Sequence, residues 1–295
     1  KGKDPCKSMH HQILVPTDFS DQCAIALGQS YNLARLSGSE ITLLYVVEED
    51  ALAPILNLLP GKNKKGLIVA TMKQRLEALA AQASKESGIR VNPVVAEGKV
   101  HEAINSTAKK MKARFIVMAT SGAKGIKKII GVNALRVVRE AACPVITIKG
   151  KKHRQGCKKI VLPLDLTKET REKVAQAIEV AGYFGSAIRV VSYVLSRDEF
   201  IFNKIQRQLS QVRDHIAEKG IECTAELISG DNIAAAVINY AKRIKADLIM
   251  IMTQQEVDFT KLFIGSSAQQ VISNSDIPVL SIRPSGKMYA KLFID

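Results

Sequence analysis

The chain has 295 residues, of which 46% are hydrophobic and 24% charged, and its formal net charge is +15 at pH 7. This length suits two domains of ordinary size, and no apolar run approaches the roughly 20 residues that cross a bilayer, so we expect neither a membrane span nor a secretory leader. The lysines are dispersed, so we expect phosphate or a small polyanion rather than nucleic acid as the partner of this positive charge.

The first half alternates β-branched apolar runs with amphipathic stretches. Short continuous apolar runs are typical of strands in a parallel sheet, and the periodic stretches between them are typical of helices that cover its faces. The predicted strands are 13–15, 41–47, 91–96, 115–119 and 144–148, and the predicted helices are 22–36, 72–84, 100–111 and a short one after Gly131.

The second half repeats the first. Ile13-Leu-Val-Pro-Thr-Asp-Phe-Ser20 returns as Ile160-Val-Leu-Pro-Leu-Asp-Leu-Thr167, and Cys143-Pro-Val-Ile-Thr-Ile-Lys149 returns as Ile277-Pro-Val-Leu-Ser-Ile-Arg283. Such a repeat indicates a tandem of one domain type. We therefore predict an α/β fold with two tandem doubly wound domains, residues 9–149 and 158–285, each a five-stranded parallel sheet with helices on both faces. The strands predicted in the second half are 159–164, 187–194, 222–228, 247–252 and 279–282.

The five cysteines show no Cys-x-x-Cys pairing. Cys143 and Cys223 lie in strand-like runs, where a thiol behaves as a small apolar group. A reducing compartment fits this usage better than a disulfide framework. We therefore expect a cytoplasmic protein.

A glycine-rich stretch follows the fourth predicted strand of the first half. Ligands of doubly wound sheets bind beyond the carboxyl ends of the strands, where the strand order reverses. Glycine lets backbone N–H groups approach an anion, a helix N-terminus adds partial positive charge, and lysine adds mobile countercharge. The stretch predicts a phosphate site, although such glycines can also serve only as turns. Its candidate residues are Thr120, Gly122, Lys124, Gly125, Gly131, Val132 and Asn133.

Asp18 stands where the first strand ends and the first helix begins. A carboxylate here can cap the helix, or it can accept a hydrogen bond from an exocyclic amine or a ribose hydroxyl of a ligand. Ser20 is able to cap the helix instead. Asp165 holds the matching position in the second half, with Thr167 as the alternative cap.

Catalytic and metal-binding patterns are absent from the sequence. The histidines show no metal-ligand spacing. The chain lacks a Gly-x-x-x-x-Gly-Lys-Ser/Thr loop, a Gly-x-Ser-x-Gly elbow and a His-Glu-x-x-His helix. We therefore expect a protein that is not an enzyme and holds no metal.

Four segments together resemble the universal stress protein family, in two copies over nearly the whole chain. They are Pro16-Thr-Asp18-Phe-Ser20, Glu97-Gly98, Gly122-x-x-Gly125 with Gly131, and Pro144-Val-Ile. The resemblance implies a strand order of 3-2-1-4-5 in each half and dimerisation through the fifth strands. In a tandem chain we expect the halves to pair with each other as an intramolecular pseudo-dimer, near 144–148 and 278–282, and a further homodimer is left open.

The resemblance also implies a ligand, because members of this family divide into ATP binders and non-binders by their glycine pattern. Carried onto this chain, Asp18 meets adenine, Val46 or Val47 lines the adenine pocket, and the glycines contact ribose and phosphates. The expected cofactor is ATP or a related adenine nucleotide. The residues expected to bind it are Pro16, Thr17, Asp18, Val46, Val47, Thr120, Gly122, Lys124, Gly125, Gly131, Val132 and Asn133.

Both copies depart from the pattern of the ATP binders. In the first, only five residues separate Gly125 from Gly131, and Val132 replaces a hydroxyl residue. In the second, Glu256 and Asp258 stand where the paired glycines belong, and their charges would repel phosphate. We predict a non-enzymatic stress-response protein that binds an adenine nucleotide in its first domain and has a degenerate second site. The alternative is a nucleotide-independent structural or partner-binding stress module.

Overall fold

The computed structural model describes residues 11–48, 64–120, 131–149, 156–165, 170–194, 199–230, 232–253 and 265–283. Strands and helices alternate through both halves, as the sequence predicts. The elements of the first half are β1 (His11–Pro16), α1 (Asp21–Ser37), β2 (Ser39–Val47), α3 (Lys64–Ser87), β3 (Val91–Glu97), α4 (Val100–Lys110), β4 (Phe115–Ala119), α5 (Val132–Glu140) and β5 (Val145–Ile148).

The second half repeats this order without a break in the pattern. Its elements are β6 (Lys159–Leu164), α6 (Thr170–Phe184), β7 (Ala187–Tyr193), α7 (Glu199–Glu218), β8 (Cys223–Ile228), α8 (Ile233–Arg243), β9 (Leu248–Met252), α9 (Ser266–Asn274) and β10 (Val279–Ile282). Helix α3 differs most from its prediction, because it begins at Lys64 and not at Met72. Ile68, Met72 and Leu76 lie at helical spacing and are all at least partly buried, so the helix extends over the basic stretch before them.

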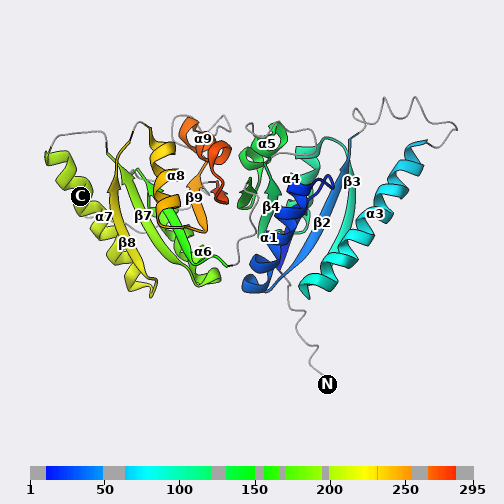
Figure 1. The fold of residues 1–295 in the computed structure, drawn as a ribbon, viewed down its shortest axis with the longest axis horizontal. Coiled ribbons are helices and arrows are strands. Elements are labelled where there is room, and N and C mark those ends of the chain that lie inside the picture. Colours follow the sequence, from blue (N-terminus) through cyan, green and yellow to red (C-terminus); the bar gives the residue numbers. More distant parts are fainter. Residues whose placement is uncertain are drawn as a thin grey trace, which may run out of the picture.

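A single ten-stranded sheet runs through both halves, in the order β3-β2-β1-β4-β5-β10-β9-β6-β7-β8 (Figure 1). Each half thus has the order 3-2-1-4-5 with parallel neighbours. The pairing register also repeats, since Ile13 lies opposite Ile41 in the first half and Ile160 lies opposite Ile188 in the second. The strand order implied by the family resemblance is therefore the order observed.

The halves meet through their fifth strands, at the segments that the sequence predicts. β5 and β10 pair antiparallel, with Ile146 opposite Leu280. The Thr147 hydroxyl adds a hydrogen bond to the Val279 carbonyl at 3.3 Å. Because each strand would otherwise be an open sheet edge, this pairing satisfies backbone groups that invite association.

Helices cover both faces of the sheet in two layers (Figure 1). Successive strand residues point to opposite faces, so Ile13 and Val15 belong to the core on the side of α1, α3, α6 and α7, whereas Leu14 belongs to the core on the side of α4, α5, α8 and α9. The apolar core on the α1 side is continuous between the halves, and the Phe115 and Phe184 rings lie 6.0 Å apart across the junction. Among the described helices, none is long and apolar enough to cross a membrane.

Candidate functional site

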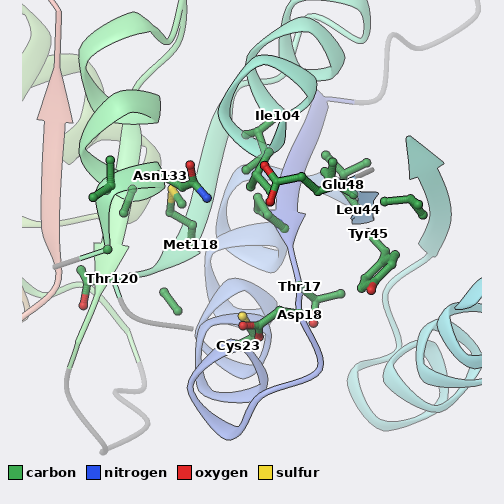
Figure 2. A pocket seen from close by; sticks show the side chains of 18 of the residues that line it. Thr17, Asp18, Cys23, Leu44, Tyr45, Glu48, Ile104, Met118, Thr120 and Asn133 are labelled. Carbon is green, nitrogen blue, oxygen red and sulfur yellow. The ribbon is translucent and has the colours of Figure 1, made fainter. Parts of the chain in front are cut away.

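A cavity of about 370 Å³ opens at the carboxyl ends of β1, β2 and β4 (Figure 2). β1 lies between β2 and β4, which is the point where the strand order of the first half reverses. Ligands of doubly wound sheets bind at this point, and small-molecule pockets usually measure about 300 to 1,000 Å³. The cavity therefore has the location and the size of a ligand site.

Most of the residues predicted from the sequence to bind a ligand line this cavity. They come from three places in the first half: the end of β1, the end of β2, and the segments that flank the start of α5. The predicted residues on its wall are Pro16, Thr17, Asp18, Val46, Val47, Thr120, Gly131, Val132 and Asn133. Gly122, Lys124 and Gly125 lie outside the described residues.

The turn between β1 and α1 positions Asp18 on the cavity wall. Ser20 is the N-cap of α1, and its hydroxyl accepts a hydrogen bond from the Cys23 N–H at 3.4 Å. The Asp18 carboxylate instead accepts a hydrogen bond from the Ser20 N–H at 3.0 Å. Asp side chains in turns commonly bind the backbone N–H two residues further along the chain. Of the two caps that the sequence allows, Ser20 is the one observed. Asp18 can therefore serve a ligand without loss of the helix cap.

Phe19 holds this turn in an uncommon backbone conformation. Its φ of 63° lies in the left-handed region, which is energetically unfavourable for a residue that has a β-carbon. Its ring lies 5.0 Å from the Tyr45 ring, and the Arg75 guanidinium stacks 4.2 Å from the ring centroid. These contacts from β2 and α3 hold Phe19 in place, and with it the neighbouring Asp18.

The start of α5 forms another wall of the cavity. Gly131 is the N-cap of α5, has no side chain to cap the helix, and donates its N–H to the Thr120 carbonyl at 2.6 Å. A β-carbon at Gly131 would lie 3.3 Å from that carbonyl, so the close approach of the chain favours glycine here. The first backbone N–H groups of a helix lack partners within it and attract anions. The wall thus offers backbone donors to a negatively charged group.

Several residues of the cavity wall are not among those predicted from the sequence. Glu48 brings a second carboxylate from the end of β2, and Val100 and Ile104 bring apolar surface from α4. Val100 and Ile104 lie one helical turn apart, and this spacing in the sequence places them on the same face of α4. Cys23 also lines the cavity. Burial, and then the negative charge of Asp18, raises the pKa of the Cys23 thiol to about 11, so at neutral pH it is protonated and a poor nucleophile.

The second half has its own cavity at the matching place, but it measures only about 150 Å³. Lys173 and Tyr193 both line it. The segments 18–47 and 165–194 are equally long, so Lys173 replaces Ala26 and Tyr193 replaces Val46. The Lys173 ammonium lies 2.9 Å from the Asp165 carboxylate. These larger side chains narrow the second cavity, a role of Lys173 that was not predicted from the sequence.

The remaining residues singled out in the sequence belong to the second half of the chain. Thr167, Glu256 and Asp258 lie outside the described residues. Gly265 and Ser267, from the second copy of the α5 motif, line the second cavity. Within the part of the chain that the structure describes, no three His, Cys, Asp or Glu residues are grouped closely enough to hold a metal ion.

Comparison with known proteins identifies the fold and the family. The solved structure of a universal stress protein from Archaeoglobus fulgidus DSM 4304 aligns with 94% of this chain and 99% of its own, with a TM-score of 0.73 and 20% identity. At that identity the likeness shows the fold alone.

Sequence relatives match one half of the chain at a time. Universal stress protein MJ0531 of Methanocaldococcus jannaschii is 32% identical over 150 residues, which are 50% of this chain and 86% of that protein. Universal stress protein MJ0577 of the same organism is 28% identical over 158 residues, or 48% of this chain and 97% of that protein. The sequence model of the universal stress protein family matches residues 9–149 and again 156–283. The chain therefore belongs to the universal stress protein family, as a tandem of two such domains.

Proposed function

We propose that the first domain, residues 9–149, binds ATP or a related adenine nucleotide, and that the second domain, residues 158–285, does not. The observation that carries this proposal is the cavity of about 370 Å³, because Asp18 and the start of α5 both lie on its wall. The family resemblance assigns the base to Asp18 and the phosphates to the start of α5. One cavity thus holds the two kinds of group that a nucleotide requires.

The chemistry of the wall suits the parts of a nucleotide. Leu44, Val46 and Met118 offer apolar surface to a base, and a carboxylate such as Asp18 accepts hydrogen bonds from an exocyclic amine. The uncapped start of α5 favours negative charge. The second cavity lacks this combination, because it has less than half the volume and Asp165 is already paired with Lys173.

The proposed activity is non-enzymatic. A nucleotide that binds one conformation or one partner complex more tightly shifts the equilibrium toward it, and this requires only a difference in affinity. We propose that the paired domains stay together in solution as an intramolecular pseudo-dimer. We also place the protein in the cytoplasm, because the described cysteines, Cys23, Cys143, Cys157 and Cys223, are all free thiols.

Titration calorimetry with ATP tests the proposal. We expect one site per chain. Asp18→Asn should weaken binding about tenfold to a hundredfold, because a charge-assisted hydrogen bond is lost. The asparagine oxygen still accepts from the Ser20 N–H, so the turn should persist. Asp165→Asn is the matched control and should leave ATP affinity unchanged. Two equal sites per chain would contradict the asymmetry.

A second candidate function is a nucleotide-independent partner-binding module. One observation favours it: the first turn of α7 exposes apolar side chains, including Phe200, which is 73% exposed. Exposed apolar patches often mark interaction surfaces. If ATP, ADP and AMP all fail to bind the folded protein, this second function replaces the first.

A further inference from the structure

The second cavity combines apolar walls with an ion pair whose lysine is buried. It lies between β6, β7 and β9 on one side and α8 and α9 on the other. Val191, Ile228, Val237 and Ile251 give it a largely apolar lining. Its volume is about 150 Å³, and apolar cavities of about that volume in proteins hold molecules of the size of benzene. The cavity is therefore large enough for a six-membered ring or a short branched chain.

Lys173 brings charge to this apolar site. The residue is only 8% exposed, and its ammonium pairs with Asp165 at 2.9 Å. Lysine is rarely buried, and an ion pair whose carboxylate reaches solvent, as that of Asp165 does, contributes little to stability. The first domain has Ala26 at the same position, fully buried. Stability alone therefore gives little reason for a lysine here, and its position on a cavity wall points to a ligand.

The charges around the cavity indicate the sign of that ligand. Gly265, at the N-cap of α9, and Ser267, in its first turn, also line the cavity, and Gly265 provides no side-chain cap. The start of the helix and the Lys173 ammonium both favour a negative group, and the Ser267 hydroxyl is a further donor. Asp165 already offsets one unit of positive charge, so the site suits a monoanion better than a polyphosphate.

Tyr193 makes the site smaller than a nucleotide pocket. It replaces Val46 of the first domain, and its hydroxyl donates to the Gly230 carbonyl, so the phenol is held at the end of β7. We propose that the second cavity binds a small carboxylate whose body is an aromatic ring or a short branched chain. The carboxylate lies toward Lys173 and the start of α9, and the body packs among the apolar side chains of β7, β9 and α8.

Benzoate is the probe, with benzamide and benzylamine as its neutral and cationic counterparts. Binding to the full chain is followed by ligand-observed NMR titration. We expect saturable binding of benzoate, binding of benzamide at least tenfold weaker, and no binding of benzylamine. An excess of ATP should not displace benzoate. This last measurement separates the present proposal from nucleotide binding in the first domain, which succeeds or fails independently.

Variants locate the site. Lys173→Met with Asp165→Asn removes both charges at similar side-chain volume and should weaken benzoate binding about tenfold to a hundredfold. Val237→Phe fills the cavity, leaves the charges in place and should abolish binding. Ile104→Phe is its matched control, because Ile104 holds the equivalent position on α4, and it should leave benzoate affinity unchanged. Ala268→Leu fills the cavity from α9 if Val237→Phe fails to fold.

Several results would overturn the proposal. One is saturable binding of benzylamine at least as tight as that of benzoate, because the ligand would then pair with the Asp165 carboxylate. Another is the absence of saturable binding of any probe to the folded parent. Unchanged benzoate affinity in a folded Val237→Phe or Ala268→Leu protein would place the ligand elsewhere.

Discussion

Asp18 and Asp165 hold the same position in two copies of one turn, yet their surroundings make them different groups. Asp18 accepts from the Ser20 N–H and faces a large cavity. Asp165 is paired with the Lys173 ammonium at the wall of a small one. A carboxylate that is already bound to a cation has less to offer a neutral amine or hydroxyl of a ligand. The difference between alanine and lysine on the following helix accounts for the pairing of Asp165.

Val132 provides a prediction at the same scale. It occupies the first position of α5, is 64% exposed, and corresponds to Ser266 in the second half. Val132→Ser should increase ATP affinity about threefold to tenfold, because its hydroxyl adds one donor near the phosphates. Stability should change by less than about 0.5 kcal/mol, since the side chain is exposed. Titration calorimetry and urea unfolding measure the two effects.

The control for this substitution is Val132→Ala, which removes the valine bulk without adding a donor. An equal increase in ATP affinity for alanine and serine would assign the effect to the loss of bulk and would contradict a hydroxyl contact with phosphate.

Among the elements, helices α1 and α6 join the halves on one face of the sheet, next to the β5–β10 pair. Arg114 connects them, because its guanidinium donates to the Ser37 carbonyl at the end of α1 and stacks 3.8 Å from the Tyr183 ring of α6. Beside it, Phe115 and Phe184 bring the two cores into contact. The junction therefore rests on these side-chain contacts and on the contact between α1 and α6, as well as on strand pairing.

Tyr183 tests the contribution of this junction to stability. Tyr183→Leu keeps an apolar side chain but removes the ring under Arg114, and should lower the free energy of unfolding by about 0.5 to 2 kcal/mol. Tyr183→Phe keeps the ring and loses the hydroxyl, which donates to Glu179 at the surface and also interacts with Arg114, and should cost less. Urea unfolding of both variants gives the comparison. Equal losses would mean that the hydroxyl, and not the ring, stabilises the junction.

Across the whole molecule, the free cysteines make stability sensitive to alkaline pH. Burial raises the pKa of the Cys157 thiol from 9.0 to about 12. A hydrogen bond with the Ser186 side chain lowers this pKa, and the nearby negative charge of Asp247 raises it. Between these values the unfolded chain has lost the thiol proton and the folded chain keeps it. The unfolded state then binds fewer protons, so the free energy of unfolding falls as pH rises.

Cys157→Ala isolates this effect. The parent should lose about 1.4 kcal/mol more than the variant for each pH unit above 9, up to about pH 12, and the two should run parallel below pH 9. Urea unfolding at a series of pH values measures the difference, and lysine titration, which is common to both proteins, cancels from it. Parallel curves above pH 9 would show that Cys157 does not keep its proton in the folded state.

The sequence alone determined the tandem, the alternation of strands and helices, and the end of the sheet at which the two cavities lie. These features follow from local patterns: repeated phrases, apolar runs, and an Asp or Gly placed where a strand meets a helix. Asp18 and Gly131 could be identified in this way, because each stands at a strand–helix boundary that the pattern itself marks.

The tertiary structure decided which of these positions form a site and what each site can hold. Cavity volume depends on which way side chains from several elements point, so the roles of Lys173 and Tyr193 became visible only once α6 and β7 lay against β6. In the same way, Cys157 lies between the two domains predicted from the sequence, yet it is buried in the core that the halves share. Contacts between residues distant in the sequence depend on the packing of helices on the sheet, which no local pattern records.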